Sequence, residues 1–520
     1  MPACRSRFFS ADASLSGHAG RAAQLISSAD HRRPFTGMPI LAAKDRRFPG
    51  GRPMRCMLLV CLLLLAPPAR AASDFTDGIW LTTGYSHAYA IGGGHLQRFE
   101  ITAISCQKSV SAERVASSEN AARFAGSSIN NDTGVTDAFA FRPGRQPNQL
   151  VLTVDGVATQ TQLTRTDALP AACSQAATAD PIVNFDIFAR TFAEQYPFFK
   201  QHHVDWDATT AAHREAIGPT TDDQTLFRHF REMLTPLEDA HVWIEAPALG
   251  QEFSGWRPPA TTSEAVHQRA LVIVEKRYLT GPLAWYCNRQ LAFGMLPDGI
   301  GYLLIVSFEN YDKNAETAAQ TAALDAALDD IFGKASGLRG LVVDIRLNGG
   351  GTEMLGLQIA GRLTATSYPA SSKIFRIDPA DPTKFSEPQP IMVAPSPRPG
   401  FYGPMALLMG HESVSAAEAF AMSLQGRRHK PVFIGENTQG VFSDVLIRHL
   451  PNGWRFGVPN EIYLNENGQA YDIKGVPPDI PITLFTAADL EAERDPALQA
   501  AMHAVDEAGR SGRFPGLPNR

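Results

Sequence analysis

The 520-residue sequence is poor in cysteine and contains almost no long apolar run. Its six cysteines include no Cys-x-x-Cys pair, which excludes a disulfide-rich scaffold, a zinc ribbon and a thioredoxin-type redox site. Several catalytic signatures are also missing: Gly-x-Ser-x-Gly, His-Glu-x-x-His, the phosphate-binding P-loop and Gly-x-Gly-x-x-Gly behind a strand. The sequence therefore gives no sign of these classes of catalytic or nucleotide-binding site.

The one apolar run that could concern a membrane follows Met54 and has the parts of a secretory signal. Arg55 supplies the positive start, residues 57–66 the apolar stretch, and residues 69–71 (Ala-Arg-Ala) a small-x-small cleavage site. Ten residues are too few to cross about 30 Å of hydrocarbon as a helix, so we expect no permanent membrane anchor. We expect the mature chain to start near Ala72.

Export to the periplasm or the outside follows from this interpretation. Residues 1–53 precede a signal that belongs at an N-terminus, so they are either a transit peptide or lie upstream of a true start at Met54, the reading that we favour. The formal charge of the whole chain is −6, and residues 1–71 contribute +8 of it. The body is therefore strongly acidic at −14, which argues against nucleic acid and anionic membrane surfaces as partners.

The body divides into segments of different pattern. Residues 74–178 alternate β-branched and apolar residues between glycine-rich turns, which predicts a small antiparallel sheet or half-barrel. Residues 180–245 carry two amphipathic helical patterns and predict a helical cap. Residues 246–297 are read as a connecting β segment, and residues 298–520 as an α/β domain with a terminal helix over 489–505.

Two cysteines lie in the β-rich segment. Cys106 and Cys173 could pair in an oxidising compartment, or could be two unrelated buried thiols; we expect the disulfide, with Cys287 left free. His202 and His203, with Asp205 and Asp207, could be imagined as metal ligands, but a solvated loop between helices is the preferred reading.

The α/β domain predicts a mostly parallel sheet, with sites at the carboxyl ends of its strands. Expected strands are 301–306, 340–346, 405–409 and 431–435; expected helices are 315–334, 355–363 and 415–424. Gly349-Gly350-Gly351 follows a strand, where it could aim N–H groups at an oxyanion or merely form a tight turn. Ser415 opens a helix, as a nucleophile or as an ordinary N-cap. His241 enters a strand, a position that is more often structural.

Taken in order, five motifs resemble the C-terminal-processing peptidase and tricorn core protease superfamily of serine peptidases. They are Asp239-x-His241, Asp344-x-Arg346-x-Asn348-Gly-Gly-Gly, Ser415-Ala-Ala-Glu418, Gly435-Glu436-x-Thr438-x-Gly440 and Gly475-Val476-Pro477-Pro478-Asp479. The resemblance covers about residues 180–505. It implies a crotonase-like core, a helical cap and peptide-bond hydrolysis through an acyl-enzyme.

The resemblance also implies roles for particular residues. Processing peptidases carry a catalytic lysine at the position of Val441, so a Ser/Lys dyad is excluded and the tricorn-like, histidine-using branch fits better. Ser415 would be the nucleophile and His241, not the nearby His411, the general base. Asp472 would orient the histidine, in preference to the competing Asp239. Backbone N–H groups of Gly350 and Ala416 would form the oxyanion hole, with Gly349 as the substitute if the loop register differs by one.

No metal or organic cofactor is expected, and the substrate would be a peptide or unfolded protein segment. Only about 54 residues separate Glu245 from Gly299, too few for the PDZ domain of processing peptidases, so we expect none. Two other functions remain open. Interphotoreceptor retinoid-binding protein shares the module, so a non-catalytic binding module is one; an esterase with the same acyl-transfer site is the other. Oligomeric state is not predicted.

Overall fold

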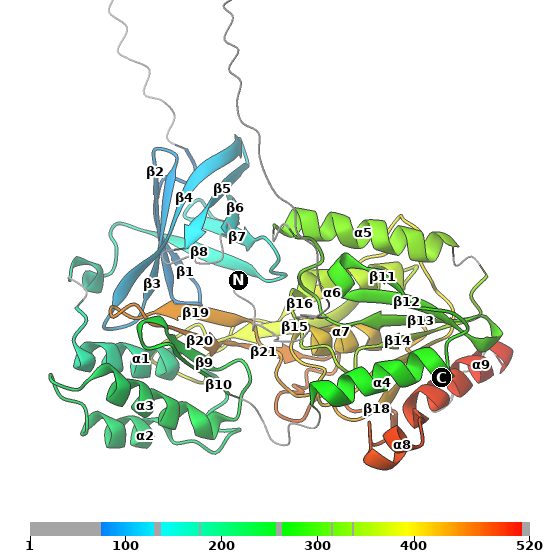
Figure 1. Cartoon of the computed structure of the whole chain (residues 1–520). Coiled ribbons are helices and arrows are strands. Elements are labelled where there is room, and N and C mark those ends of the chain that lie inside the picture. The colour runs from blue at the N-terminus through cyan, green and yellow to red at the C-terminus, as the bar shows by residue number, and fades with distance from the viewer. Residues whose placement is uncertain are drawn as a thin grey trace, which may run out of the picture. The chain divides into compact units, whose positions relative to one another are not determined.

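The first structured segment is a closed barrel of eight antiparallel strands (Figure 1). The computed structural model describes residues 74–128, 137–175, 178–255, 263–313, 316–334 and 337–511, so the predicted signal and cleavage site lie outside the described residues. Each strand pairs with the next, and the first pairs with the last, so the segment predicted to be a small antiparallel sheet or half-barrel is a full barrel. The strands are β1 (Gly78–Thr82), β2 (His87–Gly92), β3 (His95–Ile101), β4 (Cys106–Ser118), β5 (Ala121–Ser128), β6 (Asp137–Pro143), β7 (Gln149–Val154) and β8 (Gln160–Thr166).

Alternate residues of the barrel strands point inward and fill it. Trp80, Tyr89, Phe124 and Phe139 are at most 1% exposed, so side chains occupy the interior. The predicted disulfide is confirmed: Cys106, at the start of β4, is bonded to Cys173 in a short 3₁₀ turn, with a Cα–Cα separation of 4.8 Å. Cys287 is free, and burial raises the pKa of its thiol to about 12.

The helical cap contains three helices, α1 (Pro181–Gln195), α2 (Trp206–Arg214) and α3 (Asp223–Leu234). Asp180, Asp205 and Asp222 cap their N-termini by accepting backbone N–H groups. The cap is completed by a four-stranded sheet in the order β10-β9-β20-β19, which combines β9 (Trp243–Ala246) and β10 (Gln251–Ser254) with the distant β19 (Val445–His449) and β20 (Arg455–Pro459). Residues 180–245 therefore do not form this layer alone.

The central sheet has seven strands in the order β11-β12-β13-β14-β17-β18-β22. Pairing is parallel from β13 to β22 and antiparallel among β11, β12 and β13. The strands are β11 (Ala284–Tyr286), β12 (Leu291–Leu296), β13 (Ile300–Ile305), β14 (Gly340–Asp344), β17 (Met405–Met409), β18 (Val432–Gly435) and β22 (Ile480–Pro481). A separate three-stranded sheet comprises β16 (Gln389–Val393), β15 (Tyr368–Phe375) and β21 (Glu461–Leu464).

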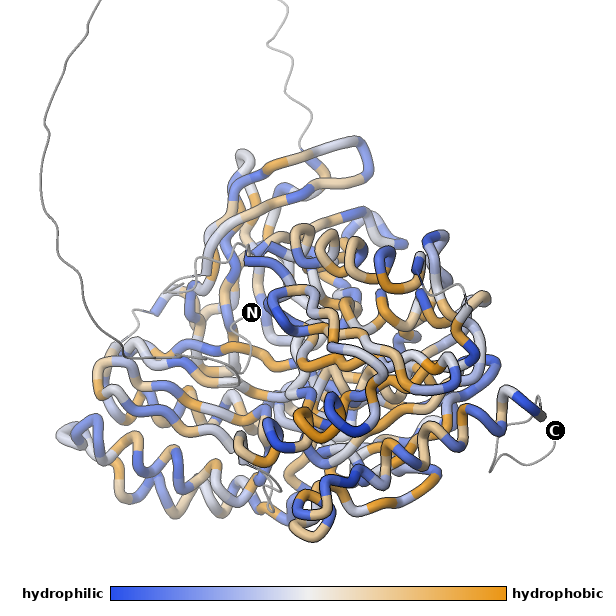
Figure 2. Tube along the Cα trace, turned by 45° about the vertical axis from the view of Figure 1, so that its right-hand side comes forward, coloured by the Kyte–Doolittle hydropathy of each residue, from blue (hydrophilic) through white to orange (hydrophobic). Residues whose placement is uncertain are grey.

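Both faces of the central sheet are covered, which explains why its strands read as unbroken apolar runs. Leu341 and Val343 belong to the same apolar cluster as residues of α5 (Thr317–Lys334), α6 (Glu353–Arg362) and α7 (Ala416–Gln425). Val342 faces the opposite way, with α4 (Glu264–Arg277) and α9 (Pro496–Ser511). Hydrophobic and hydrophilic residues alternate along α9 near the C-terminus (Figure 2).

Two expectations about secondary structure need correction. The segment 246–297 is not only a β connection, because it contains the fourteen-residue α4. The single terminal helix expected over 489–505 is two helices, α8 (Ala487–Glu491) and α9. Pro496 cannot continue a helix that precedes it, and Asp495 accepts a hydrogen bond at 2.9 Å from Arg346, which follows β14. Among the described residues, no helix has the length and apolar character needed to cross a membrane.

Candidate active site

The motif residues come together at the carboxyl ends of the parallel strands. Ser415 is the residue before α7 and has φ 60° and ψ −119°, a conformation that L-residues rarely adopt. Its backbone N–H donates to the Val441 carbonyl at 3.0 Å and to Glu418 Oε2 at 3.1 Å. These bonds hold the strained turn that presents the serine at the helix N-terminus.

Glu418 connects the serine turn to the loop at 435–441. Its buried carboxylate also accepts from Thr438 Oγ1 at 2.6 Å, Gly440 N–H at 2.5 Å and Val441 N–H at 2.8 Å. Burial raises its pKa to about 7, while the four donors act in the opposite direction. Thr438 in turn accepts from Val476 N–H at 2.7 Å, which draws the Gly-Val-Pro-Pro segment into the same cluster.

The triglycine loop lies directly against the serine. Gly350 has φ 97°, and a Cβ added to it would lie 2.8 Å from Ser415 Cβ and from the Val414 carbonyl oxygen. The N–H of Gly350 donates to Asn348 Oδ1 at 2.9 Å, so this predicted oxyanion donor already has an acceptor. The N–H of Ala416 belongs to the first residue of α7, where no intrahelical acceptor exists.

A small apolar contact joins the segment of His241 to the turn of Ser415. Ala240, beside the histidine, packs with Val414, beside the serine, and with Val441. The histidine is 6% exposed, and its Nδ1 has no hydrogen-bond partner among the described residues. Burial lowers its pKa to about 4, so the imidazole is neutral at ordinary pH.

Asp472 lines the same pocket as His241, together with Gly440, Val441 and Phe442. Its Oδ2 is buried and also lacks a partner among the described residues. Burial, followed by the charges of Glu418 and Asp239, raises its pKa well above the usual range. His241 and Asp472 thus line one pocket, and each has a buried polar atom with no hydrogen-bond partner in the part of the chain that the structure describes.

Asp239 is engaged elsewhere. Its Oδ1 accepts the backbone N–H of His241 at 2.9 Å, and its Oδ2 accepts the Tyr196 hydroxyl at 2.9 Å. Asp239 thus caps the turn that leads into the His241 segment. Both carboxylate oxygens of Asp239 thus accept hydrogen bonds, whereas Asp472 Oδ2 has no partner among the described residues. Asp472 therefore stays the residue that we predict to orient His241.

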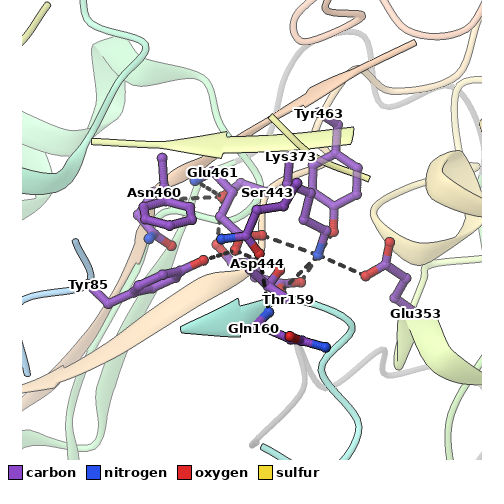
Figure 3. Close-up of polar contacts among 12 residues, drawn as sticks. Tyr85, Thr159, Gln160, Glu353, Lys373, Ser443, Asp444, Asn460, Glu461 and Tyr463 are labelled. Atoms are coloured by element: carbon purple, nitrogen blue, oxygen red, sulfur yellow. Dashed lines mark hydrogen bonds and ion pairs between the residues drawn. The ribbon is translucent and has the colours of Figure 1, made fainter. Parts of the chain in front are cut away.

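Asp444 is a residue near the site that sequence reasoning missed. Its charge acts on the His241 imidazole, tending to raise the pKa that burial lowers. It also belongs to a buried cluster around Lys373, in which the ammonium Nζ lies 2.8 Å from Glu353, 3.2 Å from Asp444 and 3.2 Å from Glu461 (Figure 3). Only its place three residues beyond Val441 could have drawn attention to it.

The Lys373 cluster joins the barrel to the site. Tyr85 and Thr159, from the barrel segment, donate to Glu461 at 2.6 and 3.1 Å. Glu353 begins α6, directly after the triglycine loop and Thr352. Lys373 is 0% exposed on its side chain and is bound to three carboxylates. At the position where processing peptidases have their lysine, Val441 packs its side chain against Ala240 and Val414.

Comparisons with known proteins agree with this arrangement. Residues 299–482 match the model of peptidase family S41. A "putative peptidase" from Parabacteroides merdae aligns with a TM-score of 0.54 and 23% identity, over 64% of this chain and 99% of that one. Mature CPAF complexed with lactacystin aligns with a TM-score of 0.45 and 12% identity, over 64% of this chain and 97% of that one. Tricorn protease aligns with a TM-score of 0.40 and 13% identity, over 76% of this chain and 46% of that one.

At this identity the Parabacteroides structure shows a shared fold, and the two lower scores add nothing to it. The family match is the stronger finding. It includes Gly350, Ser415 and Asp472, whereas His241 lies before its first residue.

Proposed function

We propose that this chain, whose residues 299–482 match the model of peptidase family S41, is a serine-type peptidase with Ser415 as its nucleophile and His241 as its general base. The contact of Ala240 with Val414 and Val441 carries this proposal, since it places the histidine segment against the serine turn. We also propose the crotonase-like arrangement for its core and an endopeptidase activity on peptides or unfolded segments.

In the proposed mechanism, Ser415 Oγ attacks the scissile carbonyl carbon while His241 takes its proton. The tetrahedral oxyanion is held by the N–H of Ala416 and by that of Gly350, which must release Asn348 to do so. Collapse breaks the C–N bond, and the leaving amine receives the proton from His241. Water then hydrolyses the acyl-enzyme with the same histidine as base. An ionised Asp472 would fix the imidazole tautomer and stabilise the imidazolium.

A fluorophosphonate probe tests the nucleophile. We expect one adduct, on the peptide that contains Ser415, and no adduct in Ser415→Ala. Cleavage of an unfolded protein substrate should be lost in the same variant. Labelling without peptide cleavage but with turnover of acyl esters favours the esterase. Absence of both labelling and turnover, with the fold intact by circular dichroism, favours a binding module.

Replacing Gly350 by alanine should lower kcat/KM by about 10²-fold, because the added Cβ would displace the serine turn. Gly453→Ala is the matched control: this glycine also has a positive φ, 87°, but nothing lies within 4 Å of its added Cβ. Both variants therefore strain the backbone, and only the first crowds Ser415. Equal activities in the two variants would contradict the proposed packing of the loop on the nucleophile.

We further propose that the protein is exported to the periplasm or secreted. The motivation is the signal-like segment before Ala72, supported by the Cys106–Cys173 disulfide, a bond typical of oxidising compartments. Intact-mass analysis of protein recovered from the exported fraction should give a chain that starts near Ala72. Soluble cytoplasmic protein that retains Met1 would contradict export.

A further inference from the structure

Three potential metal ligands meet on the outside of the cap, between α2 and α3. His213 lies in the last turn of α2, and His229 and Glu232 lie one turn apart on α3. One ligand atom from each residue lies within 4.8 Å of the others. This set differs from the His202–His203 loop that the sequence brought to attention.

The two histidines contact each other directly. Their Nδ1 atoms are 2.9 Å apart, and their rings meet edge to face at 83°. At that distance one Nδ1 must carry a proton and donate it to the lone pair of the other. His229 is 8% exposed, so its ring is held in a largely buried position beside His213.

We propose that His213 Nδ1, His229 Nδ1 and a Glu232 carboxylate oxygen form a site for a divalent transition metal of the zinc class. Two imidazoles and one carboxylate match the ligand preference of zinc, with water as the fourth ligand. A tetrahedral ion with Zn–N bonds of about 2.0–2.1 Å needs the two nitrogens about 3.3 Å apart. The two Nδ1 atoms, now 2.9 Å apart, would therefore have to move only slightly away from each other. On binding, the ring that donates moves its proton from Nδ1 to Nε2 by exchange with water, and the imidazole stays neutral.

Glu232 can turn to the ion at little cost. Its present partner is Arg228 at 3.6 Å, and both side chains are about half exposed. The bound ion would join α2 to α3, the helix whose end leads through a short 3₁₀ turn to Asp239 and His241. The site would therefore stabilise the cap segment that carries the proposed base.

Zinc titration of the EDTA-treated full-length mature protein tests the site. Isothermal titration should find one Zn²⁺ per chain with micromolar or tighter affinity, and Zn²⁺ should raise the thermal midpoint of unfolding. His213→Ala and Glu232→Gln should each weaken binding at least about tenfold and remove the thermal shift. His503→Ala is the control, because this exposed histidine on α9 should leave both readouts unchanged.

Cobalt provides an independent readout that does not depend on peptidase activity. Co²⁺ should give the visible absorption of a tetrahedral complex in the wild-type protein and in His503→Ala, and lose it in His213→Ala. Both substitutions on the cap lie at partly or fully exposed positions, and circular dichroism should show that the fold survives. Failure of the wild-type protein to bind either ion overturns the proposal. So does binding that persists unchanged in both His213→Ala and Glu232→Gln, because the ion would then lie elsewhere.

Discussion

Replacing His241 by alanine should lower kcat/KM by roughly 10⁴-fold or more while the protein stays folded. A serine hydroxyl is a poor nucleophile because its pKa lies far above neutral pH. Removing the base therefore leaves Ser415 unactivated. Ser415→Ala should have an effect of the same size, and the double variant should be no worse than either single variant. Such non-additivity is expected when two residues act as one unit. Steady-state kinetics on one peptide substrate, with circular dichroism for the fold, measures all three.

His411→Ala is the matched control for the base. His411 lies only four residues before Ser415 but on the turn that leads into α7, and its removal should leave activity near the wild-type value. Loss of turnover in His411→Ala alone, with full activity in His241→Ala, would move the base to His411. Asp472→Asn should fall between these cases, with a loss of about 10²–10⁴-fold, as expected when a carboxylate that fixes the tautomer is neutralised.

The pH profile gives a second check on His241. Because burial lowers its pKa to about 4, the neutral, proton-accepting form persists into mildly acidic solution. The acid limb of kcat/KM should therefore lie well below pH 6.5, the value for an unperturbed imidazole. An acid limb at or above 6.5 would contradict a base in this buried position.

The parts of the fold that the sequence predicted are those fixed by local patterns. Val342 and Val343 face opposite sides of the central sheet, so an unbroken apolar run was enough to indicate a buried strand. Closure of the barrel could not be predicted in this way, because it depends on the pairing of β1 with β8 across more than 80 residues. The cap sheet posed the same problem, since β20 comes from the far end of the chain.

The candidate site divides in a similar way. Ser415 and the triglycine loop follow strands, and their places could be predicted because strand ends gather at one edge of a parallel sheet. Asp444 and Lys373 are 71 residues apart and carry no motif, so nothing in the sequence predicts that they meet. The prediction of one terminal helix over 489–505 was wrong, although Pro496 within it is a residue that cannot continue a preceding helix.

Replacing Lys373 by methionine should lower the free energy of unfolding by about 3–5 kcal/mol, the range observed when one partner of a buried ion pair is removed. Methionine has a similar volume, so the loss reflects charge more than packing. In the wild-type protein, burial disfavours the ammonium, but the charges of Asp444, Glu353 and Glu461 hold the pKa of Lys373 well above its usual range. Without the ammonium, these carboxylates repel one another in a water-poor site.

The loss should depend on pH in a defined direction. Burial, with the charges of Asp444 and Glu353, raises the pKa of Glu461 to about 7, from a usual value of 4.5. A carboxyl group with a raised pKa binds a proton more tightly in the folded state than in the unfolded state. The favourable contribution of Glu461 to the free energy of unfolding is therefore complete below pH 4.5 and is lost as the pH rises through 7. Removing Lys373 strengthens this effect, so the variant should be least impaired near pH 5 and most impaired near pH 8.

Urea denaturation at both pH values, on wild type and variant, measures this difference. Lys384→Met is the matched control, because Lys384 forms an exposed ion pair with Asp378 and should show no measurable change at either pH. Adding Glu461→Gln to Lys373→Met should restore part of the stability at pH 8, since it removes one of the uncompensated charges. A deficit that is the same at pH 5 and pH 8, and is not relieved by Glu461→Gln, would mean that Lys373 acts through packing. In that case the cluster would not be the electrostatic link between the barrel, the triglycine loop and Asp444 that its contacts indicate.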